Sequence, residues 1–321
     1  MGERYVEHYV TAHSALVEPH LTAWGWEIPV YLFLGGFTAG ILVLSGAAIL
    51  AGRASPRSAR GLSLGSSAFF TLALGLISLG MGALFLDLEH KAYVWRLYTT
   101  FEPRSPMSWG AWILLLVYPV LALGAVLGAP REWLARVRPV ARFADAVVEN
   151  PAAMRAFATT AVLVGIGLGI YTGILLSSLG ARPLWSSALL GPLFLASGLS
   201  SSAAFSHWVS PRADEREAMA RIDNLFLAAE LVLIALLLIG LASASAAHAA
   251  AAELVLGGPF TAIFWVGVVG LGIVVPLLIQ SLAVSHRVAH TPIAPVLVML
   301  GGLALRFVIV FAGQASHWPV G

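Results

Sequence analysis

Residues 292–316 read PIAPVLVMLGGLALRFVIVFAGQAS and contain a single charged side chain, that of Arg306. The hydrocarbon core of a bilayer is about 30 Å thick, so a helix needs about 20 apolar residues to cross it. This stretch meets both the length and the composition that a crossing requires. It therefore predicts a membrane-spanning helix that carries one buried guanidinium.

The rest of the chain repeats this pattern. Comparable apolar segments, continuous rather than alternating with period two, lie at residues 24–52, 62–86, 109–128, 152–179, 185–208, 222–243 and 259–284. Charged residues make up only 11% of the 321 residues, against about 25% in soluble domains. We predict an all-α integral membrane protein, one polytopic domain over residues 1–321 with eight transmembrane helices. Two four-helix bundles would divide near residues 180–184, and residues 1–23 would form an outer segment.

Lysine and arginine are distributed unevenly between the predicted loops. The odd-numbered connections carry eleven of them and the opposite side carries five. Cytoplasmic loops are enriched in these residues. We therefore predict that both termini face the outside of a bacterial inner membrane, which the chain crosses several times.

The composition also limits the cofactors and partners. The chain has no cysteine, which excludes thiolate zinc sites and cysteine-ligated iron–sulfur clusters. None of the nine histidines lies in the middle of a predicted span, so a haem held between paired imidazoles is not expected. The net charge of +2 argues against a nucleic-acid partner. We predict that this chain binds no metal or haem.

Ionisable groups inside apolar spans identify functional candidates, because they are costly there. Counted at 1.5 Å per residue, Arg306 lies about 16 Å and Glu230 about 12 Å from the inner ends of their predicted helices. Their matching depths predict an interaction, either direct or through water. The pair would either fix helix packing or belong to a proton route, with Asp223 and His207 near its inner mouth.

A second polar group gathers at the predicted outer face. Glu27 and Tyr31 lie one turn apart near the start of the first helix, Asp87 ends the second helix and Gln314 ends the last. Tyr171 lies about 12 Å below the outer end of the fourth helix. That depth is too great for an interfacial aromatic residue, and its hydroxyl needs a partner.

These features resemble the NrfD-like family, the membrane subunits typified by that of polysulfide reductase. The resemblance rests on six pieces in family order: residues 28–40 (IPVYLFLGGFTAG), Asp87, and residues 105–112 (SPMSWGAW), 171–185 (YTGILLSSLGARPLW), 191–204 (GPLFLASGLSSSAA) and 301–314 (GGLALRFVIVFAGQ).

The resemblance implies a haem-free membrane anchor that reacts with menaquinone or ubiquinone. It would exchange electrons with a ferredoxin-like iron–sulfur subunit attached to a catalytic subunit, such as a molybdopterin oxidoreductase or a multihaem cytochrome. It also implies that Tyr171 hydrogen-bonds a quinone carbonyl, with Asp87 beside the same site. Glu27 matches a polar family position, whereas Tyr31 stands where some relatives carry His. Arg306 matches an arginine of the last helix.

Quinone chemistry requires donors for two carbonyl oxygens and a group that exchanges protons. The predicted quinone ligands are Tyr171, Asp87, Glu27, Tyr31 and Gln314. Proton transfer is assigned to Glu230, Arg306, Asp223, His207 and Asp87. Partner docking is assigned to the outer loop 87–108, through Lys91, Trp95, Arg96 and Arg104.

Two other functions stay open at this point. A proton-coupled secondary transporter would also bury an Arg–Glu pair, although we find no pair of broken helices in corresponding halves. A purely structural membrane anchor, surrounded by lipid and a partner complex, would use Tyr171 and Arg306 for packing alone.

Overall fold

The computed structural model describes residues 24–57, 61–134, 136–285 and 291–318. Within these ranges all regular structure is helical. The predicted outer segment 1–23 lies outside the described residues. The long helices are α1 (Glu27–Leu50), α2 (Ser67–Asp87), α4 (Pro106–Leu127), α7 (Pro151–Ser177), α8 (Leu190–Val209), α9 (Ala213–Ala244), the π-helix η3 (Ile263–Val274) with its continuation α11 (Val275–Val284), and α12 (Ile293–Ala315).

Shorter helices connect the long ones. They are η1 (Lys91–Tyr93), α3 (Arg96–Thr99), α5 (Arg131–Leu134), α6 (Arg138–Glu149), η2 (Pro183–Trp185) and α10 (Ala246–Leu256). The predicted sixth span begins earlier than expected, at Ala213, because Asp214 and Glu215 in its first turn favour a helix N-terminus. The fifth begins later, at Leu190, because residues 183–185 form a separate turn.

Among the described residues, seven helical segments are long and apolar enough to cross a membrane. The predicted eighth span corresponds to α8, which is 20 residues long but is not one of the seven. Serines and His207 lower its hydropathy, and most of its residues are buried among the other helices. The eight-span count and the outer location of the termini therefore stay predictions.

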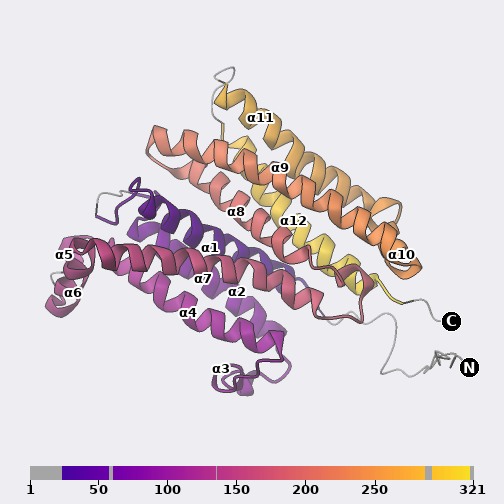
Figure 1. Ribbon diagram of the computed structural model, residues 1–321, viewed down its shortest axis with the longest axis horizontal. Coiled ribbons are helices and arrows are strands. Elements are labelled where there is room, and N and C mark those ends of the chain that lie inside the picture. The colour runs from indigo at the N-terminus through magenta and orange to yellow at the C-terminus, as the bar shows by residue number, and fades with distance from the viewer. Residues whose placement is uncertain (1–23, 58–60, 135, 286–290, 319–321) are drawn as a thin grey trace, which may run out of the picture.

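The long helices pack in two groups of four (Figure 1). Helices α1, α2, α4 and α7 form the first group, and α8, α9, η3–α11 and α12 form the second. Helix α8 joins them, since it contacts α1 and α7 as well as α9 and α12. We call the end that holds the start of α1, α3 and α10 the outer end, and the end that holds α5 and α6 the inner end, following the predicted orientation (Figure 1).

Glycine allows the two groups to approach closely. A methyl carbon added at Gly198 of α8 would lie 2.4 Å from the backbone oxygen of Gly36 on α1. One turn further in, a methyl carbon at Gly40 would lie 2.5 Å from the Gly198 oxygen, and the Ser202 hydroxyl donates a 2.7 Å hydrogen bond to the Phe37 carbonyl. Small residues at such crossings let helix backbones pack in lipid.

We predict that Gly198→Ala destabilises the protein by about 1–3 kcal/mol, because the methyl group meets backbone that cannot rotate away. The measurement is the thermal unfolding midpoint in detergent. The matched control is Gly167→Ala on α7, where an added methyl carbon has no neighbour within 4 Å. Equal midpoints for the two variants would show that the close crossing is not a constraint.

Candidate functional site

Two buried tyrosines lie near each other inside the first group of helices. Tyr31 of α1 is 3% exposed and Tyr171 of α7 is 5% exposed. The Tyr31 and Tyr171 phenols lie close enough for ionisation of one to affect the other, and the Tyr98 phenol on α3 and the Tyr118 phenol on α4 lie within such a range of Tyr31. Among the described residues, neither Tyr31 nor Tyr171 has a hydrogen-bond partner for its hydroxyl. Neither hydroxyl oxygen is among the buried side-chain atoms without a partner, so both phenol donors open onto accessible space, where a ligand can bind them.

Glycines hold the tyrosine cluster in place. A methyl carbon at Gly110 of α4 would lie 2.0 Å from the Tyr171 phenol oxygen, so this phenol rests directly on the α4 backbone. A methyl carbon at Gly80 of α2 would lie 3.6 Å from the Tyr31 ring. The cluster is therefore enclosed by backbone of α2 and α4 opposite the helices that carry Tyr31 and Tyr171.

Two carboxyl groups lie at the outer end of the same helices. Asp87 ends α2 and Glu27 begins α1, both are partly exposed, and the two interact electrostatically. Lys91, on the following loop, also acts on Asp87. The arrangement places proton-exchanging groups between the tyrosine cluster and the outer surface.

Gln314 has a different environment from the one that the sequence suggested. Its amide nitrogen donates to the Trp24 carbonyl at 3.0 Å, and its amide oxygen accepts from the Trp24 N–H at 2.9 Å. Beside it, the Trp185 indole donates to the Ile309 carbonyl at 2.8 Å. Both ends of the Gln314 amide are thus used to fasten the start of α1 to the end of α12.

Arg306 has the largest fully buried side chain among the described residues and is bound on several sides. Its guanidinium donates to the Phe194 carbonyl at 2.9 Å and to the Gly302 carbonyl at 3.2 Å. It also lies over the Phe194 ring, 4.7 Å from the centroid. A third hydrogen bond goes to the Ser197 hydroxyl. These contacts join α12 to α8.

Glu230 completes this group from α9. The carboxylate is buried, interacts electrostatically with Arg306 and is hydrogen-bonded to Ser197. Ser197 can accept from the guanidinium and donate to the carboxylate at once. In the described part of the chain, Glu230 and Arg306 are therefore connected through a serine and through space, without a direct ion pair.

Asp223 lies two turns further in on the same face of α9. It is buried, and its two oxygens accept hydrogen bonds from Ser200 and Gln280, both at 2.6 Å. Electrostatic interaction with Glu230 links it to the arginine group. His207, also buried, lies two turns inward from Ser200 on α8. A chain of buried polar groups thus runs from the middle of the protein toward the inner end.

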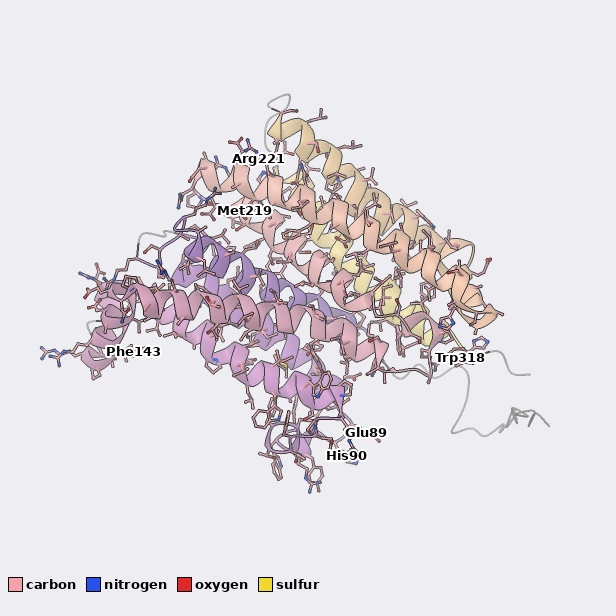
Figure 2. The ribbon with its side chains drawn as sticks, viewed as in Figure 1. Glu89, His90, Phe143, Met219, Arg221 and Trp318 are labelled. Atoms are coloured by element: carbon pink, nitrogen blue, oxygen red, sulfur yellow. The ribbon has the colours of Figure 1, made fainter. Side chains whose placement is uncertain are left out.

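The loop between α2 and α4 is a separate exposed surface at the outer end, where Figure 2 labels Glu89 and His90 at the opposite end from Phe143 of α6. Lys91, Trp95, Arg96 and Arg104 are all exposed on it. The Arg96 guanidinium stacks over Tyr93 at 4.8 Å and over Trp95 at 5.7 Å. Partial burial raises the pKa of the Tyr98 phenol on α3.

Several residues of the tyrosine cluster and of the buried polar chain were not identified from the sequence. Ser197 and Ser200 lie in the serine-rich run of α8, and Gln280 is an amide within an otherwise apolar helix. Tyr98 and Tyr118 gave no signal distinguishable from interfacial aromatics. Within the described ranges, no group of three or more histidine, aspartate or glutamate residues is placed to hold a metal ion.

Comparisons with known proteins agree with this architecture. The family described as polysulphide reductase, NrfD, matches residues 12–317. Protein NrfD of Escherichia coli K12 is 30% identical over 309 residues, covering 91% of this chain and 95% of that protein. A polysulfide reductase component from Wolinella succinogenes is 28% identical, covering 94% and 97%. A selenate reductase component from Mesobacillus selenatarsenatis is 24% identical, covering 92% and 75%.

The contacts of Arg306 generate a prediction about stability that does not depend on function. Arg306→Met should destabilise the protein by about 3–5 kcal/mol, because it leaves Glu230 buried without its counter-charge. Adding Glu230→Gln to that variant should recover part of the loss, since the neutral amide needs no counter-charge. The measurement is a double-mutant cycle of unfolding midpoints. Additive effects of the two substitutions would mean that Arg306 and Glu230 are not coupled.

Proposed function

This chain belongs to the polysulphide reductase NrfD family, and from that premise we propose that it is the quinone-reactive subunit of a respiratory oxidoreductase. It is a multi-pass protein of the bacterial inner membrane and a membrane subunit of a reductase complex. The proposal concerns what this subunit does there. It takes menaquinol or ubiquinol, or the corresponding quinone, as its substrate.

The observation that carries the proposal is the pair of buried phenols, Tyr31 and Tyr171, whose hydroxyls have no partner among the described residues. A quinone ring presents two carbonyl oxygens and no donor, so phenol donors that have no protein partner fit its chemistry. Tyr171, backed by Gly110, would hold one carbonyl, and Tyr31 lies beside it.

Proton exchange is assigned to Asp87 and Glu27. Two protons accompany the two electrons of quinone chemistry, and a carboxyl group near the ring can transfer them. Asp87 and Glu27 adjoin each other at the outer end of α2 and α1. Gln314 is omitted from the proposed quinone contacts, because both ends of its amide are bonded to Trp24.

Electrons would pass between the quinone site and a ferredoxin-like iron–sulfur subunit docked on loop 87–108. The exposed Lys91, Trp95, Arg96 and Arg104 offer the arginine and aromatic chemistry that is enriched in protein interfaces. Tyr98, on the same loop, lies within electrostatic range of Tyr31, so the docking surface and the proposed quinone site lie at the same end of the protein. A catalytic subunit, such as a molybdopterin oxidoreductase or a multihaem cytochrome, would complete the complex.

We predict that Tyr171→Phe lowers quinol turnover by at least about tenfold, the effect of losing one hydrogen bond of about 1.4 kcal/mol in the transition state. The measurement is quinol-dependent reduction by the isolated complex, with partner subunits quantified to show that assembly is intact. Gly110→Ala should act in the same direction by displacing the phenol, whereas Gly167→Ala on α7, where an added methyl carbon has no neighbour within 4 Å, should not. Near-normal turnover in Tyr171→Phe would contradict the assignment of Tyr171 to the quinone site.

We further propose that the buried polar chain conducts protons between the inner end and the quinone site. Asp223, held by Ser200 and Gln280, and Glu230, held by Ser197, are ionisable groups two turns apart on one face of α9. His207 would stand at the inner mouth and Arg306 near the upper end. Buried acids lined up between two sides of a membrane are typical of proton relays.

Glu230→Gln tests this route, because glutamine keeps the side-chain shape and the hydrogen bond to Ser197 but cannot exchange a proton. Quinol turnover by reconstituted complex should continue, while the membrane potential that accompanies it should disappear. A voltage-sensitive dye reports the potential, and an ionophore added to the unaltered complex gives its zero. A full potential in the variant would remove Glu230 from any proton route.

The two alternatives predict other outcomes in the same assays. A secondary transporter would use a proton gradient to drive a solute across the membrane with no quinol present. A purely structural anchor would tolerate both Tyr171→Phe and Glu230→Gln, provided that the complex assembles.

A further inference from the structure

The four helices around the tyrosine cluster approach each other closely at glycines. A methyl carbon at Gly165 of α7 would lie 2.8 Å from the Ala39 carbonyl of α1. Helices α1 and α2 meet at Gly80, and α4 and α7 meet at Gly110. A ring the size of a quinone cannot pass where backbone and side chain are in such contact.

The seam between α2 and α4 is equally tight in its inner half. A methyl carbon at Gly124 of α4 would lie 2.6 Å from the Phe70 ring, and one at Gly128 would lie 2.6 Å from the backbone nitrogen of Ser67. Toward the outer end, the polar contact between α2 and α4 is a 3.3 Å hydrogen bond between the hydroxyls of Ser78 and Tyr118.

A pair of hydroxyl groups is unusual on the exposed surface of a membrane-spanning helix. Ser78 is exposed on a membrane-spanning helix, where polar groups are costly unless bonded. Its hydroxyl donates to the Leu74 carbonyl at 2.7 Å, so it can only accept from Tyr118, whose hydroxyl is the donor. The Tyr118 hydroxyl would therefore lose its acceptor whenever the seam parts, and a quinone carbonyl could replace it.

Open space lies beside the same seam. Methyl carbons added at Gly75 and Gly82 would have no neighbour within 4 Å, and Leu79 between them is 67% exposed. A mainly apolar groove of about 1340 Å³ follows this face of α2 from Ser67 to Leu79. Its charged residues, Arg57, Arg131 and Glu132, lie at the inner end, away from Ser78. The groove ends at Leu79, which follows Ser78 in the chain, and its apolar lining there suits a ligand dissolved in the lipid.

Tyr118 connects this outer surface with the interior. It interacts electrostatically with both Tyr31 and Tyr98. Side chains on a helix lean toward its N-terminus, and α4 begins at the outer end, so Tyr118 leans toward the tyrosine cluster. One residue therefore takes part in both the lipid-facing seam and the enclosed site.

We propose that an isoprenoid quinone passes between the lipid and the tyrosine cluster through the α2–α4 seam at Ser78 and Tyr118. The groove along α2 guides the apolar quinone, and the Tyr118 hydroxyl transfers its hydrogen bond from Ser78 to a quinone carbonyl as the ring passes. This inference rests on the proposed quinone function and adds the route of access.

The test uses Gly82→Phe in the intact complex, embedded in lipid nanodiscs. Gly82 lies one turn outward from Ser78, and α2 begins at the inner end, so a phenylalanine there leans back over Ser78. The matched control is Gly240→Phe on α9, which is also exposed with no neighbour within 4 Å of an added methyl carbon. Gly82→Leu serves as a smaller variant should phenylalanine impair assembly.

With a long-chain quinol, kcat/KM should fall at least about fivefold in Gly82→Phe relative to Gly240→Phe, while kcat at saturation stays close to the control. Equal kcat/KM values in the two variants would overturn the route, and the groove would then hold only lipid chains. A fall in kcat alone would also overturn it, because the substitution would then act on the site itself. Absence of turnover in the unaltered complex would instead overturn the proposed function, and this inference with it.

Discussion

The burial of the Arg306 guanidinium is the constraint on which the rest of the structure depends. A charge near the middle of a membrane helix costs about 2.5–3.5 kcal/mol on insertion scales unless protein groups replace water. The Phe194 carbonyl, the Ser197 hydroxyl and the Glu230 carboxylate supply these groups from α8 and α9. Helix α8 must therefore be polar on the side that faces α12 and α9, and the remaining helices must enclose it.

That requirement explains the glycines at the centre. Gly36 of α1 lies against the guanidinium, since a methyl carbon there would be 3.2 Å from an Arg306 nitrogen, and Gly198 of α8 meets Gly36. Larger residues would push α1 away from α8 and open a path for lipid to the charge. The two groups of helices hold different kinds of polar side chain. The first holds the phenols, and the second holds the buried acids, with α8 as their shared wall.

Some members of both clusters could be named from the sequence, but their contacts could not. Depth along the helices was sufficient to associate Arg306 with Glu230, because rise per residue is fixed. Ser197 between them was not anticipated, since hydropathy does not distinguish a bridging serine from a packing one. Gln314 lies at the outer end as expected, but its amide is bonded to the Trp24 backbone, a contact between residues 290 positions apart. Tyr118 was overlooked because its significance comes only from its neighbours on α1, α2 and α3.

What the sequence determined by itself is the membrane class, the all-helical architecture and the scarcity of buried charge, because each follows from local composition and the thickness of a bilayer. Only the tertiary structure decided which phenols lack partners, that Asp223 is held by Ser200 and Gln280, and that the α2–α4 seam carries an exposed hydroxyl pair. Those facts depend on how helices far apart in the chain rotate against each other. Glycine contacts and hydrogen bonds set that rotation, and no single helix encodes it.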